Sequence, residues 1–193
     1  DAVETAVLAV DYFRGGNKYV VGVDVGGNPT KNDLRDFIPA LQLVRDAGMK
    51  VSVHCGEVPQ SRDSCDEETE AILQFRPDRI GHALFLPPSA FQSPLVQNER
   101  AIPVECCPTS NTMTIELSTT KRYNDILEGL CKHPHLKKWL ETNYPVTIST
   151  DDPGVFGTDA TREHLLLARA FHLDWKDIGN LVVKSCRFVF ERR

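Results

Sequence analysis

Five short apolar segments recur along the chain, and residues with helical spacing follow each of them. The segments begin near Tyr19, Lys50, Arg79, Ile102 and Val146. Strands that alternate with helices are typical of a parallel sheet with right-handed crossovers. All five segments end in polar or reactive side chains, as barrel strands commonly do, because the loops of a (β/α) barrel surround one site. The sequence therefore predicts an α/β protein with the (β/α)8 TIM-barrel arrangement.

Apolar residues at helical spacing predict the helices that connect these strands. A first helix is expected near the start of the chain, where Val3, Val7 and Val10 share one face. Further helices are predicted over residues 39–47, 66–73, 90–100, 136–142, 160–171 and 174–190.

Four histidines lie apart from the ends of the predicted strands. His133 and His135 follow the fourth strand, in the least regular part of the sequence, and we expect both at the surface. His164 and His172 lie within or beside predicted helices, so we expect them to have structural roles.

The second predicted strand carries the most chemical information. Val51 and Val53 alternate in it, and the strand runs directly into His54 and Glu57. Ligands bind at the carboxyl ends of parallel strands. Taken alone, His54 could equally be a hydrogen-bonded histidine of the core.

Two further strands end in groups of the same kind. The third ends at His82, and the fifth ends at Asp151 and Asp152. Two imidazoles and a carboxylate around one cavity, with Glu57 and Asp152 as further acids, suit zinc with a bound water. In this order and at strand ends, the residues predict a metal site with acid–base groups beside it.

The first and fourth predicted strands end in less specific signals. Asp24 precedes Gly26 and Gly27, and we expect it to orient the loop rather than to do chemistry. The glycines suit a tight turn or a close approach of the backbone to a ligand. The fourth strand runs into a predicted polar loop over residues 108–111, whose side chains either shape the pocket or pack against it.

The composition limits the possible functions. The 193 residues are 41% hydrophobic and 25% charged, which is typical of one globular domain. The net charge of -5 and the scattered basic residues argue against binding to nucleic acid. No apolar run approaches the roughly 20 residues of a membrane span, so a soluble, cytoplasmic protein is expected. The chain begins at Asp1, directly in a helical pattern, which indicates the inside of a larger protein.

Four ordered motifs resemble the adenosine deaminase family and together cover nearly the whole chain. They are His54-Cys55-Gly56-Glu57, Arg79-Ile80-Gly81-His82, Cys107-Pro108-Thr109-Ser110-Asn111 and Ser149-Thr150-Asp151-Asp152-Pro153. The segment Val20-Val21-Gly22-Val23-Asp24 is most similar to the adenosine-deaminase-like branch, which acts on N6-methyl-AMP. The resemblance implies a zinc-dependent deaminase that converts adenosine, AMP or N6-methyl-AMP to the inosine-type product.

The resemblance also implies a role for each matching catalytic residue. His54 and Asp151 would be ligands of one zinc ion. Glu57 would give a proton to purine N1 as water adds to C6. His82 would orient the zinc-bound water and help to deprotonate it.

Two further residues would hold the substrate by the same resemblance. Asp152 would bind purine N7, and the backbone N–H of Gly27 would bind purine N3. A small purine nucleoside or nucleotide is therefore the expected partner, and the sequence leaves the oligomeric state open.

The sequence departs from the family most clearly in its metal ligands. The family's first strand carries a His-x-His pair, and the pair with this spacing, His133 and His135, follows the fourth strand instead. The five predicted strands then correspond to barrel strands four to eight, so residues 1–193 would be the carboxyl-terminal part of the barrel domain, without strands one to three. Asn28 also stands where the family usually has aspartate.

Two alternatives stay open. The chain could be a truncated, non-catalytic fragment or isoform that at most binds purine or a partner protein, because the His-x-His ligands are absent. The metal barrel could also act on another amidohydrolase substrate, although the resemblance of Glu57 and Asp152 favours a purine ring.

Overall fold

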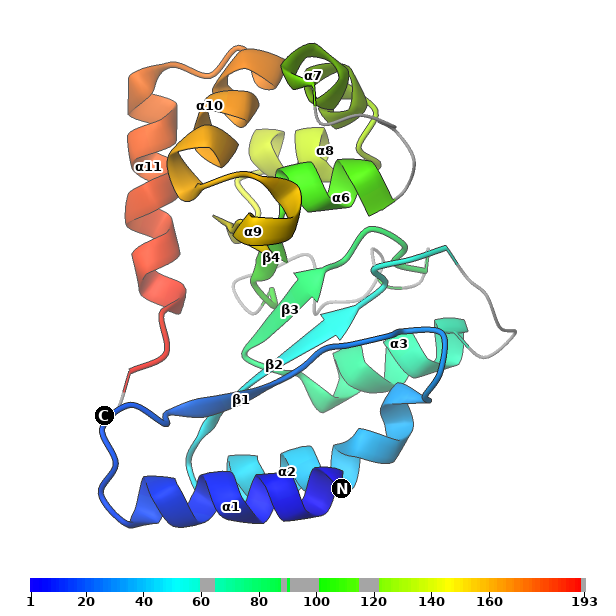
Figure 1. Ribbon diagram of the computed structural model, residues 1–193, viewed down its shortest axis with the longest axis vertical. Helices are drawn as coiled ribbons and strands as arrows, with labels where there is room; N and C mark the ends of the chain where they lie inside the picture. The colour runs from blue at the N-terminus through cyan, green and yellow to red at the C-terminus, as the bar shows by residue number, and fades with distance from the viewer. Residues whose placement is uncertain (60–64, 88–89, 91–100, 115–121, 192–193) are drawn as a thin grey trace.

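The computed structural model describes residues 1–59, 65–87, 90, 101–114 and 122–191. Its centre is a sheet of five parallel strands that pair in chain order (Figure 1). The strands are β1 (Gly22–Val25), β2 (Lys50–Cys55), β3 (Arg79–His82), β4 (Val104–Cys106) and β5 (Val146–Ile148). Their order never reverses, as it would in a doubly wound sheet. The α/β class and the parallel sheet are confirmed.

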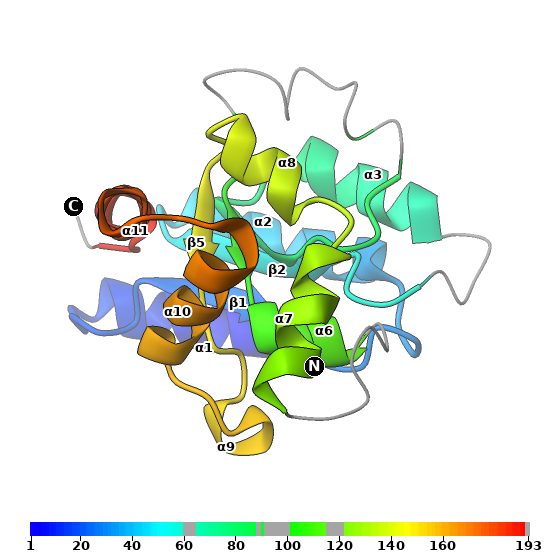
Figure 2. The ribbon, with the colours of Figure 1, turned by 90° about the horizontal axis from the view of Figure 1, so that it is seen from above.

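Helices precede, connect and follow the strands and lie around the sheet when it is seen from above (Figure 2). They are α1 (Ala2–Arg14), η1 (Leu34–Phe37), α2 (Ile38–Asp46), α3 (Cys65–Phe75), α6 (Pro108–Thr114), α7 (Tyr123–Cys131), α8 (Leu136–Glu141), α9 (Pro153–Phe156), α10 (Ala160–Phe171), α11 (Trp175–Ser185) and η2 (Cys186–Phe188). α1 and α2 pack beside β1 and β2, and α11 packs beside β5 at the other edge. No described helix is long and apolar enough to cross a membrane.

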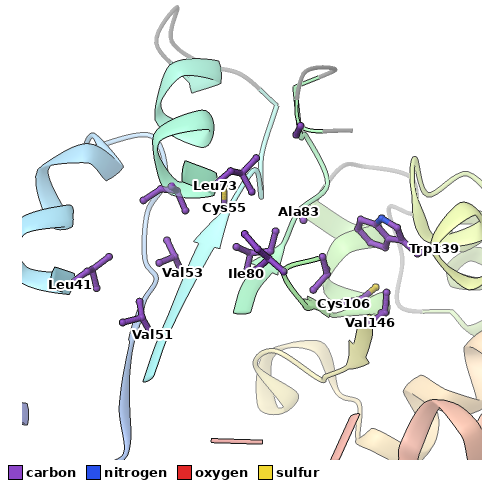
Figure 3. Close-up of a cluster of buried hydrophobic side chains, with 14 of the residues drawn as sticks. Leu41, Val51, Val53, Cys55, Leu73, Ile80, Ala83, Cys106, Trp139 and Val146 are labelled. Carbon is purple, nitrogen blue, oxygen red and sulfur yellow. The ribbon is translucent and has the colours of Figure 1, made fainter. Parts of the chain in front are cut away.

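Side chains of β2 alternate between an apolar core and the opposite face of the sheet. Val51, Val53 and Cys55 are at most 1% exposed, and they belong to one core with Leu41 of α2 and Leu73 of α3 (Figure 3). Full burial of an aliphatic side chain contributes about 1.5–3 kcal/mol. A slip of β2 by one residue would turn all three side chains to the other face, so this core fixes the strand register.

The opposite face of the sheet is polar. Ser52 donates a hydrogen bond to Glu105 Oε2 at 3.0 Å, and Arg79 Nε lies 2.6 Å from Glu105 Oε1. Alternate residues of a strand share a face, so His54 lies on the same face as Ser52. The register that buries the apolar residues of β2 therefore points His54 into the polar side of the sheet.

Three predicted elements differ from their sequence patterns. β1 does not include Tyr19, which is 92% exposed. α11 ends at Ser185, so it does not continue to Phe190. Arg79 instead donates to the carbonyl oxygen of Phe188 at 2.7 Å, and its guanidinium carbon lies 3.5 Å from the centroid of the Phe190 ring. The expected polar loop after β4 is the helix α6, which begins at Pro108, a residue well suited to the first helical position.

The surface position expected for His133 is wrong. The side chain is 5% exposed, and its Nδ1 accepts the backbone N–H of Leu136 at 3.1 Å and that of His135 at 3.3 Å. These contacts satisfy backbone donors at the start of α8 that have no partner within the helix. The helix predicted over residues 90–100 lies almost wholly outside the described residues.

Candidate active site

The carboxyl ends of β2, β3 and β5 bring most of the predicted catalytic and metal-binding residues together. His54 lies in β2, His82 ends β3, and Asp151 follows β5. Potential ligand atoms of His54, Glu57 and His82 lie within 4.8 Å of one another, and so do those of His82, Cys107 and Asp151. Because the two groups share His82, this residue occupies the middle of the site.

The ring of His54 fits between two glycines. A Cβ atom at Gly81 would lie 2.8 Å from His54 Cδ2, and one at Gly26 would lie 3.1 Å from Cε1. Such distances leave no room for a larger residue at Gly81 unless the ring moves. On the polar face, His54 Nε2 lies 3.1 Å from Asp24 Oδ2. This hydrogen bond raises the pKa of His54 in spite of its partial burial, so Asp24 contacts a predicted residue of the site.

His82 and Asp151 both have backbone torsions in the left-handed region, with φ of 60° and 56°. Non-glycine residues rarely adopt this conformation, and it costs on the order of 1–3 kcal/mol for each residue. Next to His82, the N–H of Ala83 donates to the carbonyl oxygen of Cys55 at 3.0 Å and ties the end of β3 to β2. Backbone strain of this kind concentrates at functional sites.

Asp151 is supported by α6 and, through it, by α10. Ser110 Oγ donates to Asp151 Oδ2 at 2.6 Å. The preceding residue, Thr109, donates its backbone N–H and its hydroxyl to Glu163 at 2.9 and 2.6 Å, and the Thr158 hydroxyl donates to Glu163 as well. Glu163 is 0% exposed. Nothing in the helical pattern around Glu163 distinguishes it from a solvated glutamate, so sequence analysis missed it.

The predicted substrate-binding residues have different environments. Gly27 lines a pocket together with Asn28, His54 and Glu57, and its φ of 127° requires glycine. Asp152 is exposed and is the N-cap residue of α9. It lies outside both groups of potential metal ligands found among the described residues.

The donor types at the site fit zinc. The imidazole of His54, the carboxylates of Glu57 and Asp151 and the thiol of Cys107 are grouped with the imidazole of His82. Imidazole nitrogen with carboxylate oxygen is a common donor set of catalytic zinc. His54 and Asp151 fall in different groups among the described residues. A closed site would therefore need ligands beyond these two.

Comparison with known proteins decides the family. A family model described as Adenosine deaminase matches residues 1–192. The chain belongs to the adenosine deaminase family. It is 36% identical over 189 residues to N6-Methyl-AMP deaminase-L of Xenopus laevis, a match that covers 98% of this chain and 50% of that protein. The resemblance inferred from the four motifs is thus confirmed.

Solved structures place this adenosine deaminase family chain within a TIM barrel. Arabidopsis ADAL in complex with IMP is similar with a TM-score of 0.80 and 31% identity, over 99% of this chain and 50% of that one. The same plant protein in complex with GMP gives a TM-score of 0.81 with equal identity and coverage. The chain therefore spans about half the length of the relatives that it matches, and the predicted fold class is confirmed.

Proposed function

We propose that the protein to which this chain belongs hydrolyses the exocyclic amine at C6 of a purine nucleotide of the AMP or N6-methyl-AMP type, with zinc as cofactor. The observation that carries the proposal is the convergence of His54, Glu57 and His82 in an adenosine deaminase family chain. His54 and Glu57 also line the pocket that Gly27 lines. A nucleotide is favoured because a relative is named for N6-methyl-AMP and the plant relative binds IMP and GMP. Adenosine is the alternative substrate.

His54 and Asp151 would hold one zinc ion, together with two histidines from an amino-terminal segment of the same protein. Bound zinc would supply a Lewis acid that makes water nucleophilic near neutral pH. In this proposal residues 1–193 are the carboxyl-terminal part of the barrel domain and contribute its strands four to eight.

The other site residues hold the ring and move the proton. Glu57 gives a proton to purine N1 while water adds to C6, and the amine then leaves from the tetrahedral carbon to give the inosine-type product. The backbone N–H of Gly27 and the carboxylate of Asp152 hold N3 and N7. His82, in the middle of the site, orients the attacking water.

A second candidate is a non-catalytic polypeptide, and one observation favours it for this chain alone. His133 binds the backbone of α8 through Nδ1. This bond occupies Nδ1 of His133, and neither His133 nor His135 belongs to the two groups of potential metal ligands found among the described residues.

One experiment tests both candidates. The 193-residue chain and the complete protein are purified, their zinc content is measured, and N6-methyl-AMP, AMP and adenosine are offered separately while the purine absorbance is followed. We expect turnover of the nucleotides by the complete protein. A complete protein that holds stoichiometric zinc but converts none of the three compounds would contradict the proposed reaction.

A further inference from the structure

Two buried histidines are joined through one asparagine at the inner end of the site. His82 Nδ1 lies 2.9 Å from Asn111 Oδ1, and Asn111 Nδ2 lies 3.3 Å from His133 Nε2. The exposed fractions of His82, Asn111 and His133 are 2%, 0% and 5%. A half-turn of the Asn111 amide exchanges its oxygen and nitrogen and moves no other group. The protons on the two rings therefore decide which atom of the amide faces which ring.

The main chain fixes the proton of His133. Its Nδ1 accepts the N–H groups of Leu136 and His135 at 3.1 and 3.3 Å. A backbone N–H is always a donor, so Nδ1 carries no proton. Burial lowers the pKa of His133 to about 3. The ring is therefore neutral near pH 7, and its single proton is on Nε2.

The proton on His133 Nε2 needs an acceptor, and the Asn111 amide is the group that faces it. If the amide nitrogen faced His133, two N–H donors would oppose each other in a buried place, at a cost on the order of 1–3 kcal/mol. The amide oxygen therefore faces His133. The amide atom in this position also lies 3.8 Å from Cys106 Sγ, and because burial raises the pKa of the Cys106 thiol, its S–H remains available as a second donor.

We propose that His133, acting through Asn111, holds neutral His82 in the tautomer that has its proton on Nε2. With the amide oxygen turned to His133, the amide nitrogen of Asn111 faces His82 Nδ1 and donates to it. Nδ1 of His82 must then accept, so the proton lies on Nε2. This atom is 3.8 Å from Glu57 Oε1, a carboxylate oxygen that favours a facing N–H. His133 is thus a positioning residue.

The consequence for the site rests on the proposed deaminase function, although the tautomer itself does not. His82 presents an N–H donor to the attacking water and orients it by donating a hydrogen bond. The family resemblance implied the opposite direction, in which His82 helps to remove a proton from the water.

The tautomer can be read without any assay of activity. In the complete protein labelled with 15N-histidine, long-range proton–nitrogen spectra distinguish a ring nitrogen that carries a proton from one that does not. We expect a protonated Nε2 and an unprotonated Nδ1 for His82 at neutral pH. A proton on Nδ1 of His82 would overturn the proposal, whether or not the protein proves to be a deaminase.

A pair of matched variants tests the part played by His133. In His133→Asn the new amide oxygen is bonded to Cγ, as Nδ1 is in histidine, so the N–H groups at the start of α8 keep an acceptor. The Nε2–H that donates to the Asn111 amide oxygen is lost. We expect signals of both His82 tautomers in this variant. His172→Asn replaces an exposed histidine at the C-cap of α10 and should leave the His82 signals unchanged. A single Nε2-protonated form of His82 in His133→Asn would remove His133 from the proposal.

Asn111→Asp gives an independent test that does not depend on how the His133 variant folds. An ionised carboxylate only accepts hydrogen bonds. The proton of His82 should therefore move to Nδ1, the reverse of the wild-type state. His82 signals that match the wild type would contradict the role given to the Asn111 amide.

Discussion

Glu57 is the residue whose replacement tests the proposed chemistry most directly. Glutamine has nearly the same shape but no acidic proton for purine N1, so Glu57→Gln in the complete protein is expected to reduce turnover about 10²- to 10⁴-fold. Zinc content should be unchanged. Initial rates with N6-methyl-AMP measure the turnover, and metal analysis measures the zinc content. Glu67→Gln is the control, because Glu67 is an exposed residue of α3. A Glu57→Gln rate within about threefold of wild type would exclude this residue as the general acid.

Gly81 is expected to be essential for the position of His54. Alanine at this residue would bring its Cβ to 2.8 Å from His54 Cδ2, so the ring must move and the zinc content of the complete protein should fall. Gly179→Ala in α11 is the control, since nothing lies within 4 Å of the added atom, and it should stabilise the helix by about 0.5–1 kcal/mol. Normal zinc content in Gly81→Ala would show that His54 is not a ligand.

Asp151 and Asp152 are adjacent but are expected to respond differently to replacement. Asp151 lies beside His82 and accepts the Ser110 hydroxyl, so Asp151→Asn should deplete zinc. Asp152 is exposed, and Asp152→Asn should raise KM and lower kcat while metal content stays normal. Metal analysis and steady-state kinetics of the two variants test this division, and equal zinc loss in both would contradict it.

At the scale of elements, the join between α6 and α10 depends on one buried carboxylate. Glu163→Gln replaces an acceptor-only group by an amide whose NH₂ must face a donor, either the Thr109 N–H or a threonine hydroxyl. We expect the free energy of unfolding to fall by about 1.5–3 kcal/mol, the range for a lost hydrogen bond to a charged group. Urea unfolding of the complete protein measures this free energy. The control is Glu141→Gln, at a 64% exposed side chain of α8, which should change the free energy of unfolding by less than about 0.5 kcal/mol. Equal midpoints for the two variants would contradict this role of Glu163.

Elements with an apolar face were predictable, and the helix α6 was not. The alternation of Val51 and Val53 in β2 and the short segment that ends at His82 are local signals, and they placed His54 and His82 correctly at strand ends. The buried residues of α6 are Pro108, Thr109, Ser110, Asn111 and Thr112. A search for apolar periodicity cannot detect a helix whose buried face is polar.

The contacts that support the site could not be predicted from the sequence, for a related reason. The bond from Thr109 to Glu163 spans 54 positions, and the contact from Asn111 to His133 spans 22. Neither pairing leaves a pattern in the residues around it. Only the folded arrangement shows that Glu163 and His133 are buried and bonded rather than solvated.

At the scale of the whole molecule, the chain alone is expected to associate with itself. A closed barrel of this type needs about eight strands, whereas among the described residues β1 and β5 are the edges of a five-stranded sheet. Apolar side chains are also exposed on α1 and α11, including Leu8 at 57%, Tyr12 at 53% and Val183 at 64%. Open strand edges and apolar faces promote association.

Light scattering, the unfolding transition and zinc analysis test this expectation for the purified 193-residue chain. We expect aggregates or a broad transition, weak zinc binding and no measurable deamination, with activity restored when an amino-terminal segment of the complete protein is added. A monomer with a cooperative transition, stoichiometric zinc and ordinary turnover would contradict it.

The contact between Arg79 and residues 188–190 also determines when part of the fold can form during synthesis. The guanidinium of Arg79 and the carbonyl oxygen of Phe188 are 109 positions apart, and the Phe190 ring reaches back to Gly22 of β1, where an added Cβ would meet it at 2.9 Å. On a ribosome, β1 and β3 emerge long before their partner in the tail exists. Contacts between such distant positions form late. The contacts of Arg79 on the polar face of the sheet are therefore completed only when synthesis of this region is nearly over.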